Sequence, residues 1–316
     1  MVSAPSLSLT LAPQKLHRDM LEVTMLSRCL TVLLLISGSA VAQKPPTARE
    51  VIDQIKAHVG VPWRAETVDT IKAGDPETPV TGIATTMMAT FDVIRSAQAE
   101  GKNLVITHEP TFYSHLDKTD GFEKDNDPVW ADKQKFIVDH KMVVWRFHDH
   151  WHMRRPDGIM EGVLNTLGWQ KFYNAESRTV KLPAPVGLDA LAAEVQAKMG
   201  AKVLRVVGDR QMKVTTVAMS PGAGGPMGHL RALRRPEVEV LLVGEVPEWE
   251  TIEYVNDASA QGKRKALLLV GHIPSEQPGM DNCASWLKTF ITSVPIGFVP
   301  TIEPFWTPAV GVRSAQ

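Results

Sequence analysis

Three apolar segments, each the length of a β-strand, end abruptly in histidines and carboxylates, and this pattern limits the folds that the chain can adopt. The segments are residues 103–107, 142–147 and 266–271, and they run into His108-Glu109, His148 to His152, and His272 to Glu276. Ligands of open α/β sheets bind beyond the carboxyl ends of strands. Imidazoles and carboxylates placed there are typical ligands of divalent transition metals. The sequence therefore predicts a metal site assembled from three distant segments.

Apolar runs alternate with segments of helical period along most of the chain. The expected strands are residues 81–86, 104–107, 142–147, 179–182, 203–207, 214–219, 238–243 and 266–270. The expected helices are residues 47–59, 91–100, 127–140, 158–167, 188–199, 250–260 and 281–290. This alternation is typical of α/β units whose helices cover the sheets. We expect an α/β fold in two halves, with a boundary near residues 170–185, where the sequence becomes polar and carries two prolines.

The first 42 residues have the order of a secretory signal. Arg28 precedes a short apolar core at residues 30–36, and a small-x-small triplet follows at residues 40–42. The apolar core is too short to cross a bilayer, which needs roughly 20 apolar residues. We expect an exported protein, periplasmic or secreted, whose residues 43–316 form the folded part and are not associated with a membrane once the signal is removed. A disordered N-terminal tail is the alternative.

Charge and cysteine content narrow the possible partners and ligands. The formal net charge is −1, from 34 basic and 35 acidic residues, and no basic patch of the kind that binds nucleic acid stands out. Beyond the expected signal the sequence has one cysteine, Cys283, so no internal disulfide can form. In an exported protein, a metal site would therefore rely on nitrogen and oxygen ligands.

His108 and Glu109 are neighbours at the end of the first apolar segment. Neighbours in a strand point to opposite faces, so both can reach one site only where the strand has ended. Pro110 favours such an end because it drives the preceding residue into an extended or turn conformation. Diverging neighbours suit two metal ions roughly 3.5–4 Å apart. The alternative is that His108 caps the strand and Glu109 is solvated.

Three histidines alternate after the second apolar segment, at positions 148, 150 and 152. In an extended chain they would share one face, with the first and last ~13 Å apart, too far to bind the same ion. We therefore expect one or two ligands among them unless the chain turns. Asp149 can hold the second nitrogen of a ligating imidazole.

His272 and Glu276 are four residues apart, with Pro274 between them. On a helix this spacing would place both on one face, but Val270-Gly271 favours a tight strand-to-loop turn. Either geometry lets the two groups converge, and Glu276 can bridge two cations; a solvated loop is the alternative.

Two further features lie at or near strand ends in the second half. Glu245 follows the apolar run at 238–243 and adds a carboxylate there. The glycine-rich residues 222–225 can present backbone amides to an anion, or form a plain turn.

These segments resemble the Nif-three-like dinuclear-metal-centre hexameric family, some members of which carry the name type 2 GTP cyclohydrolase I. The resemblance extends from about residue 48 to residue 290. The matching pieces are residues 80–85, 103–110, 148–158, 243–245 and 271–279, the last being the most specific. The resemblance implies two α/β halves with mixed sheets covered by helices, packed face to face. It also implies a two-metal site at the carboxyl ends of strands between the halves, and a ring-shaped homohexamer.

The resemblance also implies a ligand set. His108 and Glu109 would each bind a different metal, His152 and His272 would each bind one metal, and Glu276 would bridge both. Glu109 stands where the family has a second histidine, and His152 stands where it has an aspartate. The two exchanges leave the number of imidazoles and carboxylates unchanged, which favours a retained site. Glu248-Trp249 departs from the histidines that the family usually has at those positions.

Together these features predict a dinuclear metal-binding protein that acts as a metal-dependent hydrolase on an unidentified small molecule. Two divalent ions, of zinc, iron or manganese, would lower the pKa of a bridging water. Glu245 or His148 would move protons. The alternative is a non-enzymatic metal-binding or assembly protein.

Overall fold

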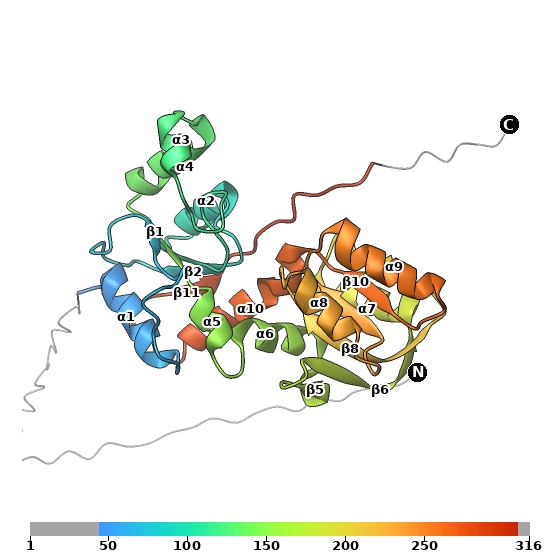
Figure 1. The fold of residues 1–316 in the computed structure, drawn as a ribbon. Helices are drawn as coiled ribbons and strands as arrows, with labels where there is room; N and C mark the ends of the chain where they lie inside the picture. The colour runs from blue at the N-terminus through green and yellow to red at the C-terminus, as the bar shows by residue number, and fades with distance from the viewer. Residues whose placement is uncertain (1–43, 309–316) are drawn as a thin grey trace, which may run out of the picture. The chain divides into compact units, whose positions relative to one another are not determined.

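The computed structural model describes residues 44–308, which form two mixed β-sheets and the helices that pack on them (Figure 1). The expected secretory signal lies outside the described residues. Within this part of the chain, no helix has the length and apolar character that crossing a membrane requires.

The first sheet has five strands in the order β1-β4-β3-β2-β11. Their bounds are β1 Ile71–Ala73, β2 Ile83–Thr86, β3 Leu104–Thr107, β4 Val143–Arg146 and β11 Ile296–Phe298. β1 is antiparallel to β4, and the other four strands are parallel to one another. The carboxyl ends of β3 and β4 therefore meet at one edge of the sheet, which brings residues 108 and 148 near each other.

The second sheet has six strands in the order β5-β6-β8-β9-β10-β7. Their bounds are β5 Tyr173–Asn174, β6 Thr179–Gly187, β7 Arg205–Val207, β8 Lys213–Ser220, β9 Val240–Val243 and β10 Ala266–Leu269. β8, β9 and β10 are parallel, whereas β5, β6 and β7 pair antiparallel with their neighbours. Both sheets are thus mixed and covered by helices, which confirms the predicted fold class.

Helices cover each sheet because its strands bury apolar side chains on both faces. In β3, Leu104 and Ile106 belong to one core cluster and Val105 belongs to another on the opposite face. Each sheet has a cluster of buried apolar residues on its outer face. In the first sheet this cluster lies under α2 Phe91–Ala99 and α4 Pro128–Asp139. In the second sheet it lies under α8 Pro226–Leu233 and α9 Glu253–Ala260. Figure 1 shows α1, at Ala48–His58, on the other side of the first sheet from α2 and α4.

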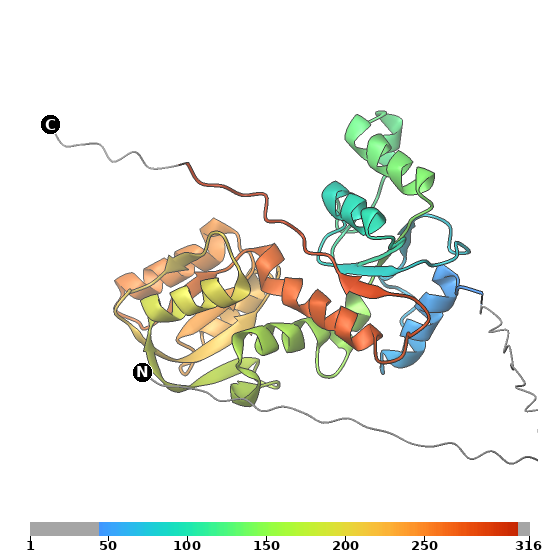
Figure 2. The ribbon, with the colours of Figure 1, turned by 180° about the vertical axis from the view of Figure 1, so that it is seen from behind.

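One continuous cluster of buried apolar residues contains the inner faces of both sheets. It also takes in α6 Gly158–Leu167, α7 Leu188–Met199 and α10 His272–Leu287. α6 and α10 lie side by side, as Figure 2 shows. They approach so closely that a Cβ on Gly162 would lie 2.3 Å from the carbonyl oxygen of Pro278. Only glycine permits this contact at position 162.

The turn expected after β10 is wrong, because the chain there enters a helix at once. α10 begins at His272 and continues to Leu287, whereas the sequence predicts a helix only from residue 281. Pro274 falls in the first turn, where a helix does not need the amide proton. Pro278 lies inside the helix and removes one hydrogen bond. Packing against α6 stabilises the helix despite that loss.

Of the two conformations considered for residues 148–152, the structure has the turn and not the extended chain. The chain turns at His148 into a short helix, α5, at Asp149–Met153. The helix expected from residue 250 divides into a π-helical turn at Glu248–Ile252 and α9. The short elements β1, β5, β11, α3 (Asp120–Lys124) and η1 (Gln170–Phe172) were not expected from the sequence.

Candidate metal centre

His108 is held at the carboxyl end of β3 with one ring nitrogen in use and the other without a partner. The residue is fully buried, and Nδ1 lies 3.3 Å from the carbonyl oxygen of Phe147, to which it can donate. Nε2 is buried and has no hydrogen-bond partner among the described residues. Burial, together with the charges of His148 and His152, lowers the pKa of His108 well below its ordinary value. His108 is therefore a neutral imidazole with a lone pair directed into the site.

α5 owes its position to Asp69, a fully buried carboxylate from the loop before β1. Asp69 accepts hydrogen bonds from the backbone amides of His148, Asp149 and His150, at 2.6, 2.9 and 2.9 Å. It also accepts one from Nδ1 of His150 at 2.6 Å. These bonds satisfy the free amides at the start of the helix. They turn the chain, so that His148 and His152 fall on one side.

His150 stabilises the fold around α5 and does not belong to the histidine cluster. Its Nε2 accepts the backbone amide of Arg64 at 3.0 Å, and its ring stacks on Trp63 with the ring centroids 3.6 Å apart. Both ring nitrogens are thus occupied by the fold.

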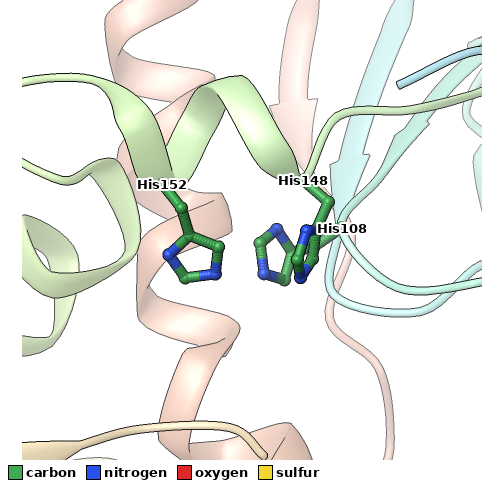
Figure 3. Close-up of side chains that lie close together, drawn as sticks. All are labelled: His108, His148 and His152. Atoms are coloured by element: carbon green, nitrogen blue, oxygen red, sulfur yellow. The ribbon is translucent and has the colours of Figure 1, made fainter. Parts of the chain in front are cut away.

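The imidazoles of His108, His148 and His152 come together, as Figure 3 shows. One nitrogen of each lies within 4.8 Å of the corresponding nitrogens of the other two. The second nitrogens of His148 and His152 are held by carboxylates: Asp149 Oδ1 lies 3.0 Å from Nδ1 of His148, and Asp157 Oδ2 lies 3.1 Å from Nδ1 of His152. Such outer partners orient ligating imidazoles in metal sites.

Glu276 lies at the centre of the cluster, and its two carboxylate oxygens face different imidazoles. Oε2 lies 3.0 Å from Nε2 of His272 and 3.7 Å from Nε2 of His108. Oε1 lies 3.8 Å from Nε2 of His152. The carboxylate is buried, and a Cβ on Gly222 would come within 2.2 Å of Oε1. The glycine-rich loop thus forms a close-fitting wall for Glu276.

Glu109 reaches the same cluster from the end of β3 and is anchored by a buried arginine. Nη2 of Arg146 lies 3.2 Å from Oε2 of Glu109, and Nε of Arg146 donates to the carbonyl of His108 at 3.1 Å. The other oxygen, Oε1, lies 3.4 Å from Nε2 of His272 and 3.8 Å from Nε2 of His148. His108, Glu109 and Glu276 form a second group whose ligand atoms lie within 4.8 Å of one another.

The carboxylates of Glu109 and Glu276 stabilise a positive charge on the imidazole of His272, which lies between them. Burial disfavours the charged form of His272, but hydrogen bonds to Glu109 and Glu276 outweigh it and raise its pKa to about 11. Burial also works against the charge on Glu109, yet the hydrogen bond from His272 and the charge of His148 lower its pKa to about 2. A cluster that stabilises a cation in this way, beside the unpartnered Nε2 of His108, fits a divalent metal with nitrogen and oxygen ligands.

The structure brings together five residues predicted as ligands, namely His108, Glu109, His152, His272 and Glu276. It adds His148, which the sequence predicts as a proton-moving group, to the imidazole group that can hold an ion. Glu245, the other predicted catalytic residue, lies at the edge, with its side chain 60% exposed and Oε2 3.3 Å from Nδ1 of His272.

Sequence reasoning missed Asp69, Arg146 and Asp157, which position the ligands. Asp69 gives no signal, because it is about 80 residues from the histidines that it holds. Arg146 is a charge within an apolar strand, which is a usable sign of a buried partner. Asp157 precedes a helix and caps it through the amides of Ile159 and Met160, a pattern that sequence can predict.

A cavity of about 1260 Å³ opens on the cluster. His148, His152, His272 and Glu276 all line it, so a small molecule can reach the ligand atoms from this side. The remaining wall comes mainly from α6, the β5–β6 hairpin, the end of β8 with the loop that follows it, and α8.

Comparisons with known proteins agree with this architecture. A curated relative from Clostridium acetobutylicum, named GTP cyclohydrolase 1 type 2 homolog, is 25% identical over 221 residues, which is 66% of this chain and 77% of the relative. Two solved structures show the same fold. The Bacillus cereus protein related to NIF3 has a TM-score of 0.64 at 13% identity and covers 84% of this chain and 100% of its own. Staphylococcus aureus protein SA1388 has a TM-score of 0.63 at 16% identity with the same coverage.

The family model for Duf34/NIF3 (NGG1p interacting factor 3) matches residues 46–303. This range includes both sheets and every residue of the cluster. The protein belongs to the Duf34/NIF3 family and contains a cluster of histidines and glutamates that can bind metal.

Proposed function

We propose that this protein binds two divalent metal ions and hydrolyses a small molecule that enters the cavity beside them. The observation that supports this most is the position of Glu276. Its two oxygens face separate imidazoles on different elements, which is the arrangement a carboxylate needs to join two ions. A single-ion site would not require both oxygens of a buried carboxylate to be directed at opposite partners.

The residues divide into two overlapping sets. His108, His148 and His152 offer three nitrogens to one ion, with Glu276 beside them. His272 and Glu109 offer a nitrogen and an oxygen to the other, again with Glu276. Zinc, iron and manganese all accept this mixture of imidazole and carboxylate. When bound, such a pair supplies an activated water at neutral pH and a Lewis acid for a carbonyl or phosphoryl oxygen.

The other residues position these groups and move protons. Arg146 and Asp157 fix the orientation of Glu109 and His152. Glu245 is the candidate proton-moving group, because its carboxylate is exposed in the cavity wall and its Oε2 can accept a proton there. Glu276 and His108 are buried, which limits their contact with bulk water.

The test is to measure metal content and turnover in matched variants. We expect the wild-type chain, purified without added metal, to contain about two ions by elemental analysis, and His272→Ala to lose metal and turnover while its oligomer stays intact. His140→Ala is the control, because His140 is an exposed histidine outside the cluster. The substrate panel contains esters, amides and phosphodiesters, and also GTP, because the name of the clostridial relative refers to a GTP cyclohydrolase.

The outcome also separates the two functional classes. Tight metal binding with no turnover of any substrate in the panel would contradict the hydrolase and support a metal-binding or assembly protein. Loss of metal from His140→Ala to the same extent as from His272→Ala would contradict the ligand set.

A further inference from the structure

Four arginines line the cavity in addition to the residues of the metal centre. They are Arg155, Arg178, Arg231 and Arg235. Only Arg235 has a carboxylate within 4 Å in the described part of the chain, that of Glu237 at 3.5 Å. Arginines in a cavity wall without carboxylate partners form a site suited to an anion, because the guanidinium group matches carboxylate and phosphate geometry.

Arg178 is the best-defined of these arginines, because its backbone is held in an unusual conformation. It lies in the turn between β5 and β6 with φ of 50°, a left-handed conformation that costs energy for a residue other than glycine. Its carbonyl accepts the amide of Met219 at 2.9 Å, and the carbonyl of Ser177 accepts Nη1 of Arg235 at 2.8 Å. Arg235 therefore acts as a positioning residue for the turn.

The guanidinium of Arg178 is exposed and makes no hydrogen bond or ion pair with another side chain that the structure describes.

The remainder of the cavity wall is partly apolar and includes Met160, Leu164 and Leu241. Its carboxylates outside the centre are few. Glu161 is paired with Arg154 at 2.8 Å, and Asp157 and Glu245 face His152 and His272. Glu176, on the same hairpin as Arg178, is left as the opposing charge. The volume of about 1260 Å³ exceeds what a free ion needs and accommodates a molecule of ordinary ligand size.

We propose that Arg178, with Arg155 and Arg231, binds an oxyanionic group of the substrate, either a carboxylate or a phosphate, while an apolar body contacts the wall beside it. The substrate is then a small amphiphilic anion whose hydrolysable bond is separate from the charged group. The hydrolysis of that bond rests on the proposed function, whereas the binding of the anion does not.

The test measures direct binding by calorimetry with three probes of similar size: phenylphosphate, 4-phenylbutyrate and the neutral 4-phenylbutanol. We expect at least one anion to bind the full chain and the alcohol to bind at least tenfold more weakly. Arg178→Gln should weaken anion binding roughly tenfold or more, since a charge-assisted contact is lost, and Arg178→Lys should restore part of it. The preferred anion distinguishes a phosphate from a carboxylate substrate.

The matched control is Arg95→Ala, which removes an exposed arginine of α2 outside the cavity and should leave all affinities unchanged. Three results overturn the inference: no binding of either anion, equal binding of the alcohol, or wild-type affinity in Arg178→Gln. Loss of anion binding in His272→Ala with retention in Arg178→Gln also overturns it, because the anion would then sit at the metal centre. Anion binding that depends on Arg178 in a protein without turnover supports the inference and contradicts the hydrolase.

Discussion

At the scale of single residues, the centre depends on which nitrogen of each imidazole is already in use. Nδ1 of His108, His148 and His152 faces a carbonyl or a carboxylate, so Nε2 is left to face the cluster. The fold therefore engages Nδ1 of each histidine and leaves Nε2 available to an ion. Asp157 does this for His152 and at the same time caps α6.

The double role of Asp157 allows its two functions to be separated. Asparagine caps helices as well as aspartate does, but it brings no charge to Nδ1 of His152. We expect Asp157→Asn to keep its stability and to bind metal 10- to 100-fold more weakly, the usual cost of losing an outer partner. Competition with a chromophoric chelator measures the affinity. Asp127→Asn, which changes the matching cap of α4, should bind metal like the wild type; equal losses in both variants would exclude the orienting role.

At the scale of elements, the short helix α5 and the 16-residue helix α10 carry most of the centre. α5 presents His152 and follows His148, and α10 presents His272 and Glu276 one turn apart. α10 is located by its contact with α6, where Gly162 faces Pro278 and Gly279 faces Ile159. The spacing of α6 and α10 therefore sets the distance between Asp157, at the start of α6, and the ligands of α10.

We expect Gly162→Ala to destabilise the protein by about 1–3 kcal/mol, because its Cβ would overlap the backbone of Pro278 and force the helices apart. Urea unfolding measures the loss, and the metal affinity should fall with it. Gly121→Ala in α3 is the control, since a Cβ there meets no atom within 4 Å; it should be neutral or slightly stabilising. A fully stable Gly162→Ala protein would mean that α6 and α10 can separate without cost.

A second element-scale prediction concerns acid stability. Glu239, just before β9, accepts hydrogen bonds from the amides of Thr215 and Thr216 in β8 at 2.5 and 3.1 Å. Burial works to raise its pKa, but these bonds lower it below the ordinary 4.5. A lowered folded-state pKa stabilises the protein above pH 4.5, and this stability is lost as the pH falls through the folded-state pKa. Glu239→Gln should be less stable than wild type at neutral pH and similar at low pH in thermal unfolding; a constant difference at every pH would contradict this linkage.

The strands and the positions of the ligands were predictable, because they depend on local patterns. β3, β4 and β10 are short apolar runs followed by polar residues, and parallel pairing brings two of their ends together. α5 and the start of α10 were not predictable, since each depends on a distant partner. Asp69 turns the chain at His148, and contact with α6 sustains a helix through Pro278. The two prolines of α10 argue against a helix there, and residues 149–153 give no clear helical pattern.

At the scale of the whole molecule, the family resemblance implies a homohexamer. Large aromatic side chains are exposed within the described residues, with Trp249 76% and Trp306 80% accessible. Aromatic residues are enriched at protein interfaces, so these are candidates for contact between copies. We expect light scattering after size exclusion to give a mass six times that of the chain, and Trp306→Ala to lower it. A monomeric wild-type protein would exclude the ring.

The apolar cluster that includes inner residues of both sheets has a consequence for how the protein is assembled and divided. If the chain were cut near residue 172, each fragment would expose the apolar surface that the other fragment covers. Exposure of that surface to water would destabilise both fragments. We therefore expect residues 44–308 to unfold as one cooperative unit. A domain swap or split-protein design in this scaffold must exchange both sheets together.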